Sequence, residues 1–90
     1  MNKDRRQYLI KNELGLHARA ASAFVKIANR YRAEILVSKE SVRVNGKSIM
    51  GVLMLAAAKG MTIDIEAEGD DATEALDALG KLIEEKFGEE

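Results

Sequence analysis

The single histidine of the chain, His17, stands two residues before Arg19 at the start of a segment with helical periodicity. The first backbone N–H groups of a helix have no partners within it, and with the helix dipole they attract an anion such as phosphate. A neutral imidazole is a nucleophile near neutral pH, and a guanidinium presents a planar fork of donors to phosphate oxygens. We therefore predict that either ring nitrogen of His17 accepts a phosphoryl group, which Arg19 stabilises. Position alone leaves open that His17 is only a helix cap or a surface residue.

A second pattern surrounds Ser48, which precedes a run rich in leucine, methionine and alanine. A serine directly before a helix accepts a hydrogen bond from the first turn, so Ser48 is predicted to be an N-cap. Gly46-Lys47-Ser48 also matches the end of a nucleotide-binding P-loop, but that motif needs a glycine where this chain has Ser41. The chain has no cysteine and only one histidine, so we predict no disulfide, metal site or cofactor.

Two periodicities mark the elements that must position these side chains. Alternating apolar residues indicate strands, and repeats at three- and four-residue steps indicate amphipathic helices. We predict strands at residues 7–10, 34–38, 41–44 and 61–68, and helices at residues 18–31, 48–58 and 72–87. This β-α-β-β-α-β-α order predicts an α+β fold, a two-layer open-faced sandwich. Three helices would cover one face of a four-stranded, mainly antiparallel sheet.

The two ends of the chain receive no functional role from their sequence. Residues 1–90 are predicted to form a single domain, with residues 1–5 flexible. Asp71 and Glu74 have the spacing of an acidic capping box for the last helix. The acidic pairs Glu84-Glu85 and Glu89-Glu90 are interpreted as a solvated helix end. The buried stripe of this helix is predicted at Ala72, Leu76, Leu79, Ile83 and Phe87.

Composition argues against two classes of partner. The net charge of −1 gives no field for non-specific nucleic-acid binding, and two Tyr, two Phe and no Trp provide few side chains for stacking on bases. A small nucleic-acid-binding α+β domain therefore remains only as an alternative. The longest apolar stretch, residues 52–58, is too short to span a membrane, and no signal-peptide core follows residues 1–6. We expect a cytoplasmic protein.

The segment Gly15-Leu16-His17-Ala18-Arg19-Ala20-Ala21 resembles the active-centre signature of the HPr family, the histidine-containing phosphocarriers of the bacterial phosphotransferase system. Residues 45–52, Asn-Gly-Lys-Ser-Ile-Met-Gly-Val, are similar to the family's regulatory-serine motif. The two motifs lie in the family's register, and the element order matches from about residue 6 to residue 87. One departure is Ala20, where the family usually carries proline. Proline fixes φ in a first helical turn, so Ala20 restrains His17 less.

The resemblance implies a role for the whole chain. His17 would accept a phosphoryl group that originates from phosphoenolpyruvate, with enzyme I as donor, and pass it to an enzyme IIA-type acceptor. The protein would be a monomeric carrier rather than an enzyme. A regulatory adaptor without phosphotransfer is the alternative, and the resemblance does not choose between the sugar-uptake and nitrogen-related branches. Ser48 would be a substrate of an HPr kinase/phosphorylase, if it is more than a cap.

The resemblance also implies a docking face. Ile49, Met50 and Leu53 lie on a helix that is apolar on too many sides to be wholly buried, and such patches often bind partners. The family's shared face would also include the start of the first helix, unless some of these residues complete the core. Its predicted apolar and small residues are Ala20, Ser22, Ala23, Ile27, Ile49, Met50, Leu53 and Met54, with Arg19, Lys26 and Lys47 as a positive rim.

Overall fold

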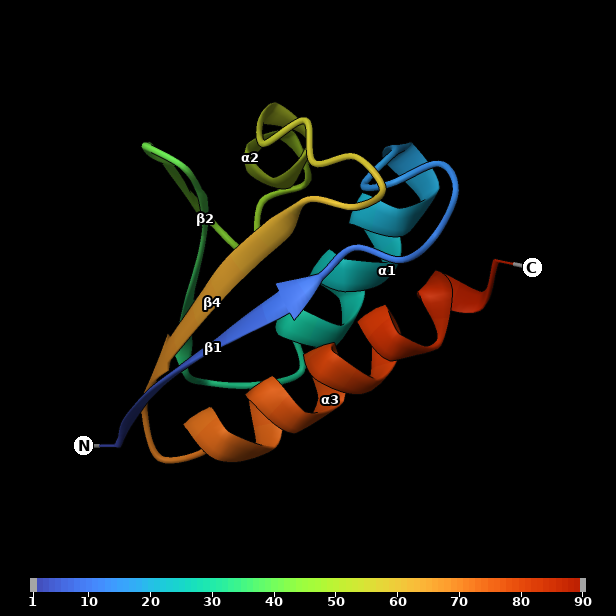
Figure 1. Cartoon of the computed structure of the whole chain (residues 1–90). Helices are drawn as coiled ribbons and strands as arrows, with labels where there is room; N and C mark the ends of the chain where they lie inside the picture. Colours follow the sequence, from blue (N-terminus) through green and yellow to red (C-terminus); the bar gives the residue numbers. More distant parts are fainter. Residues whose placement is uncertain (1, 90) are drawn as a thin grey trace.

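The computed structural model describes residues 2–89, which fold into a sheet covered on one side by helices (Figure 1). The sheet has the strand order β1-β4-β2-β3, and every neighbouring pair is antiparallel. The predicted α+β sandwich is therefore confirmed. Its elements are β1 (Lys3–Leu9), α1 (Ala18–Ala28), β2 (Glu34–Lys39), β3 (Val42–Asn45), α2 (Ile49–Met54), β4 (Thr62–Glu68), α3 (Ala72–Glu84) and the short 3-10 helix η1 (Lys86–Gly88).

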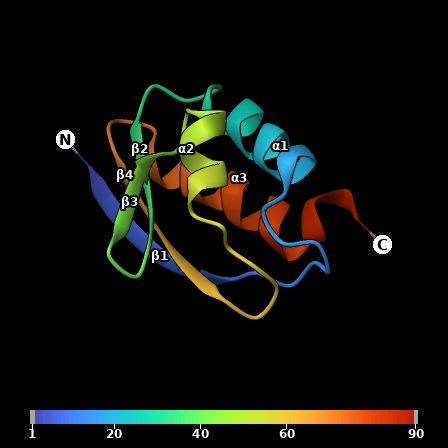
Figure 2. The same ribbon diagram turned by 90° about the horizontal axis from the view of Figure 1, so that it is seen from above.

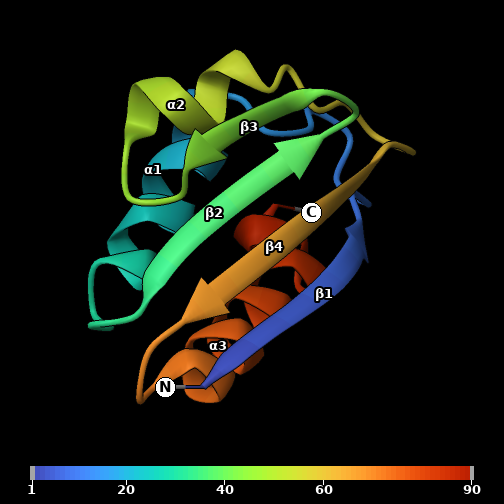
Figure 3. The ribbon, with the colours of Figure 1, turned by 90° about the vertical axis from the view of Figure 1, so that its left-hand side faces the viewer.

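The interior strand β4 shows how the two faces of the sheet differ in exposure. Its residues alternate between buried and accessible, as the sequence predicted, and the helices lie on one side only (Figure 3). On the open face Glu66 pairs with Lys3 at 2.9 Å and with Arg43 at 2.8 Å. Hydrogen bonding between Lys3 and Glu66 raises the pKa of the lysine and lowers the pKa of the carboxyl. The fully buried core includes Ile10, Phe24, Ile35, Val37, Ile63, Ile65, Leu76 and Leu79.

The first strand begins earlier than predicted. β1 includes residues 3–5, which the sequence analysis expected to be flexible, because they pair with the end of β4. Lys3 lies opposite Glu68 and Arg5 opposite Glu66, so the basic start of the chain matches the acidic open face of β4. Charge pairing across strands supplies a signal that apolar alternation within one strand does not contain.

The second helix is shorter than predicted, and its end matters for the site. α2 stops at Met54 instead of continuing to residue 58, and Ala56 adopts a left-handed φ of 49°. The chain then runs beside the loop that precedes α1 (Figure 2), where the carbonyl of Ala57 accepts a hydrogen bond from Leu16 N–H at 2.9 Å. This tertiary contact outweighs the helix propensity of the alanines.

The third helix lacks the predicted capping box. Asp71 occupies the N-cap position of α3 but makes no capping hydrogen bond from its side chain. Its carboxylate instead accepts hydrogen bonds from the backbone N–H groups of Arg32 and Ala33, at 2.9 and 2.8 Å. These bonds lower the pKa of Asp71, the bond from Arg32 most strongly. Asp71 therefore ties α3 to the segment between α1 and β2. Of the predicted stripe, Ala72, Leu76, Leu79 and Ile83 are buried.

Within residues 2–89, no helix combines the length and the apolar character that crossing a membrane requires.

Candidate active site around His17

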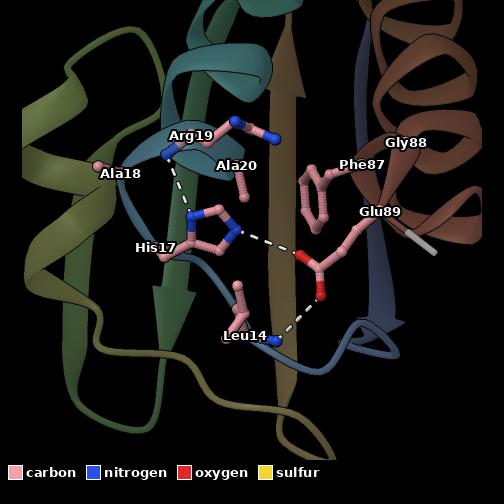
Figure 4. Close-up of a pocket in the computed structure, with 8 residues that line it drawn as sticks. All are labelled: Leu14, His17, Ala18, Arg19, Ala20, Phe87, Gly88 and Glu89. Carbon is pink, nitrogen blue, oxygen red and sulfur yellow. Dashed lines mark hydrogen bonds and ion pairs between the residues drawn. The ribbon is translucent and has the colours of Figure 1, made fainter.

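His17 is itself the N-cap of α1. Its backbone is extended, and its carbonyl accepts the first helical hydrogen bond from Ala21 N–H at 2.8 Å. The ring nitrogen Nδ1 accepts a hydrogen bond from Arg19 N–H at 3.2 Å (Figure 4). An imidazole nitrogen thus does what a serine or aspartate oxygen does at most helix starts. The lone pair of Nδ1 consequently points to the anion-attracting end of α1.

The loop before α1 holds His17 in place. Gly15 adopts a φ of 65°, and a Cβ there would lie 2.5 Å from the carbonyl oxygen of Ala57, so no other residue fits without a shift. The buried side chain of Asn12 donates from Nδ2 to the Gly15 carbonyl at 2.8 Å. Leu16 is buried directly before the histidine. Packing and hydrogen bonds therefore fix the backbone of His17 and the loop that leads to it.

Arg19 lies beside His17 in an open pocket. The pocket is lined by residues from the loop, from the start of α1 and from the chain after α3 (Figure 4). The Arg19 side chain is exposed, and among residues 2–89 its guanidinium forms no hydrogen bond or ion pair. It is therefore available to an anion that enters the pocket. The lining residues are Leu14, His17, Ala18, Arg19, Ala20, Phe87, Gly88 and Glu89.

Glu89 is a site residue that sequence reasoning missed. Its carboxylate accepts hydrogen bonds from Leu14 N–H and from Asn12 Nδ2, both at 3.1 Å, and its Oε2 lies 3.2 Å from Nε2 of His17. The bond from Asn12 is the main reason why the pKa of Glu89 is lowered, and His17 adds to it. The interpretation of this position as part of a solvated helix end is wrong, whereas Glu90 lies outside the described residues.

The path of the chain explains why periodicity did not reveal Glu89. α3 ends at Glu84, and Lys86, Phe87 and Gly88 then adopt left-handed φ values of 57°, 57° and 79°. This turn folds the chain back toward His17, and Phe87 leaves the helical stripe predicted for it, half-buried against the core. Gly88 was the one available sequence signal, because glycine tolerates this conformation.

Ser48 lies apart from this pocket, at the N-cap of α2. Its Oγ accepts a hydrogen bond from Gly51 N–H at 3.1 Å, so the predicted cap is confirmed. Asn45 supports the same turn, because its side-chain oxygen accepts a hydrogen bond from Lys47 N–H at 2.8 Å. The Ser48 side chain is half-buried. The cap is thus one end of a short helix that lies next to α1 (Figure 2).

The predicted docking face is only partly accessible. Met50 and Met54 are about two-thirds exposed, at 70% and 69%, and Ile49 is exposed as well. Ile27 and Leu53 are half-buried against the core. Ala20, by contrast, is fully buried, so its assignment to the face is wrong. Ala20 and Phe87 both belong to the wall of the pocket beside His17.

The residues of the positive rim and the small residues of the face also differ in their exposure. Lys26 and Ser22 are exposed, whereas Ala23 is half-buried. The ammonium of Lys47 is not wholly available to a partner, since its Nζ donates a hydrogen bond to the carbonyl of Tyr31 at 2.7 Å.

The departure at Ala20 removes no helical hydrogen bond. The first bond of α1 comes from Ala21 N–H, so the N–H of Ala20 precedes the helical series. A proline here would lose nothing in hydrogen bonding, and alanine loses only its restraint on φ. The hydrogen bonds around Nδ1 and Nε2 supply the positioning of His17 in this chain.

Known proteins match this chain over nearly its whole length. The family model described as the phosphorylation site of the PTS HPr component matches residues 5–85. Phosphocarrier protein HPr of Neisseria meningitidis is 54% identical over 80 residues, covering 89% of this chain and 90% of that protein. A crystal structure of HPr from Thermoanaerobacter tengcongensis matches with a TM-score of 0.93 and 47% identity, covering 97% of this chain and 98% of that one. A structure described as an HPr dimer from the same organism matches with a TM-score of 0.78 and 49% identity, covering 91% and 94%. The chain therefore belongs to the HPr family of phosphocarriers of the phosphotransferase system.

Proposed function

We propose that this chain takes a phosphoryl group from enzyme I onto Nδ1 of His17 and passes it to an enzyme IIA-type acceptor. The observation that carries this proposal is the position of Nδ1, whose lone pair points to the start of α1 and accepts Arg19 N–H at 3.2 Å. Nδ1 would form the bond to phosphorus while the bond from phosphorus to the donor breaks. The phosphoryl oxygens would then accept hydrogen bonds from the helix start.

Arg19 is proposed to stabilise the phosphoryl group. Its guanidinium is exposed and has no partner within the described chain, yet its backbone is fixed in the first turn of α1. A bidentate contact to phosphate oxygens would balance the negative charge during transfer. Donor and acceptor proteins would supply the remaining groups, so the chain acts as a carrier rather than as an enzyme.

Phosphorylation by a purified enzyme I tests this function. With phosphoenolpyruvate present, mass spectrometry should detect one acid-labile phosphate on the parent chain and none on His17→Ala. Phosphorus–nitrogen NMR couplings in the labelled protein should identify Nδ1. Undiminished acid-labile label on His17→Ala would refute the assignment of His17, and label on Nε2 would refute the choice of nitrogen.

Partners are proposed to dock on the exposed part of α2 and the neighbouring surface of α1. Ile49, Met50 and Met54 form an apolar patch, and methionine side chains adapt to several partner surfaces. Lys26 is exposed on α1 and favours an acidic partner surface. The proposal takes the chain to be a cytoplasmic monomer, for which light scattering during size-exclusion chromatography should give the mass of one chain.

Ser48 is proposed as a regulatory site for an HPr kinase/phosphorylase. Ser48 is directly followed by the exposed residues Ile49 and Met50, so a phosphate there would sit at the edge of the docking patch. The negative charge is compatible with a helix start, whereas a partner that buries the patch would have to desolvate it. Incubation with the purified kinase and ATP should add an acid-stable phosphate to the parent but not to Ser48→Ala.

A further inference from the structure

The two ring nitrogens of His17 have different partners, which defines their roles. Nδ1 accepts a hydrogen bond from Arg19 N–H, so it carries no proton in this arrangement. The proton of the neutral ring is then on Nε2, which faces Oε2 of Glu89 at 3.2 Å. An ionised carboxylate only accepts hydrogen bonds, so Nε2 is the donor in this contact.

The position of Glu89 is defined by more than its contact with His17. Oε1 accepts from Leu14 N–H and Oε2 accepts from Asn12 Nδ2, each at 3.1 Å. Asn12 is itself buried and bonded to Gly15, within the loop that fixes the backbone of His17. These donors favour the ionised form, in agreement with a lowered pKa of the Glu89 carboxyl. The carboxylate and the imidazole are therefore held by the same loop.

The backbone before Glu89 adopts an unfavourable conformation to bring it there. Lys86 and Phe87 are non-glycine residues with left-handed φ values, and such residues cluster where the surrounding structure compensates the strain. Phe87 provides compensation by packing against the core, and Glu89 by its three hydrogen bonds. The turn thus delivers one acidic side chain to the only histidine of the chain.

We propose that Glu89 is a positioning residue for phosphoryl transfer, whose carboxylate keeps the proton on Nε2 and so presents the Nδ1 lone pair for attack. This inference rests on the proposed function. As Nδ1 forms its bond to phosphorus, the bond to the donor breaks and its electron pair leaves with the donor. Nε2 keeps its proton, so the ring becomes positively charged beside the Glu89 carboxylate. Transfer to the acceptor reverses these changes, and the cationic ring is a good leaving group.

This arrangement has a physical precedent in other histidine sites. A carboxylate that accepts the second N–H of an imidazole fixes its tautomer and raises the basicity of the opposite nitrogen. In hydrolases with a buried carboxylate, the same contact stabilises the charged ring that forms during reaction. The side chains of His17 and Glu89 are 29% and 20% exposed, so water weakens the effect here.

The test compares Glu89→Gln with Glu85→Gln. Both substitutions remove one negative charge from the segment after α3, but Glu85 is exposed and forms no side-chain hydrogen bond within residues 2–89. Single-turnover rates should be measured for loading by enzyme I and for unloading to an acceptor. Glu89→Gln should slow loading by about tenfold, the size expected for a partly exposed charge-assisted hydrogen bond. Unloading should not slow, because the carboxylate stabilises the charged ring of the loaded state. Glu85→Gln should react like the parent.

Nitrogen NMR of the His17 ring provides a readout that a merely structural role would not change. In the parent, the spectra should show a proton on Nε2 whose exchange with water is slowed. Glu89→Ala should speed this exchange even if its melting temperature equals that of the parent. A parent ring protonated on Nδ1 would overturn the inference.

The signs of the rate changes separate the remaining outcomes. An unchanged loading rate in Glu89→Gln, with a parent that labels normally, would show that Glu89 does not position His17. Faster loading would show instead that the carboxylate competes with the incoming phosphoryl group, which also overturns the inference. A parent chain that takes no label would overturn the proposed function, while the NMR spectra would still test the contact between Nε2 and Glu89.

Discussion

The pocket around His17 and the patch on α2 are built from different kinds of residue. Around His17, a glycine with positive φ, a buried asparagine and a strained turn hold an imidazole and a carboxylate at defined hydrogen-bond distances. On α2, a six-residue helix presents methionines that are about two-thirds exposed. Transfer chemistry depends on geometry, whereas docking on several partners depends on adaptable apolar area. The two regions should therefore fail in different ways when they are changed.

The largest effect after loss of His17 itself is expected at Arg19. We predict that Arg19→Ala slows saturated phosphoryl transfer by about a hundredfold, the usual scale for removing one group that stabilises charge in a transition state. The melting temperature should change little, because the guanidinium has no partner within residues 2–89. Rapid-quench kinetics at saturating enzyme I and thermal unfolding measure the two quantities. A variant that melts well below the parent but transfers normally would make Arg19 structural.

Met50→Asp tests the other region. Met50 is 70% exposed in the first turn of α2, where negative charge favours the helix, so the fold should be unchanged. A partner that buries this position must desolvate the charge, and we expect KM for enzyme I to rise by about tenfold. The saturated rate should equal that of the parent, in contrast to Arg19→Ala.

Leu9→Asp is the matched control for Met50→Asp. Leu9 is also an exposed apolar residue, at 46%, but it lies on β1 in the sheet, away from α2 (Figure 3). The KM of Leu9→Asp for enzyme I should stay at the parent value. Equal increases in both variants would mean that any new negative charge weakens association, and the patch on α2 would lose its special role.

The local features of both regions could be predicted from the sequence. His17, Arg19 and Ser48 depend on their place at helix starts, and a helix start is specified by residues within a few positions. The sheet and its buried face followed from alternation, which depends on neighbouring residues in the same way.

The features that the sequence analysis did not predict all depend on contacts between segments that are distant in the sequence. Glu89 reaches His17 only because three residues after α3 turn with positive φ, and Ala20 is buried where that segment meets α1. α2 ends early because Ala57 accepts a hydrogen bond from the loop before α1. Asp71 binds backbone N–H groups in place of capping its own helix. Local propensity contains no information about such pairings.

A smaller effect is expected at Ser48, which lies at the start of α2 beside the patch. We predict that Ser48→Asp raises KM for enzyme I severalfold and leaves the melting temperature close to that of the parent, because aspartate also caps a helix. Ser48→Ala should keep the parent KM but lose about 1 kcal/mol of stability with its hydrogen bond to Gly51 N–H. Steady-state transfer kinetics and thermal unfolding of both variants decide this. Equal KM values would make Ser48 only a cap.

The smallest effect is a difference in acid sensitivity between the two regions. The pKa of Glu89 is lowered from its usual 4.5, so the folded state favours the ionised carboxylate, and its contribution to stability is present above that value. The contribution is lost as the pH falls through the lowered pKa, because the protonated group then accepts weaker hydrogen bonds. We therefore predict that Glu89→Gln melts slightly below the parent at neutral pH and that the difference fades in acid. Ser48→Ala should keep its deficit over the same range, since a hydroxyl does not titrate there. Thermal unfolding of the three proteins between neutral pH and about pH 3 measures both differences. If the Glu89→Gln deficit stays constant to the acid end of this range, the carboxylate holds the chain by packing alone, and the electrostatic contrast between the two regions is wrong.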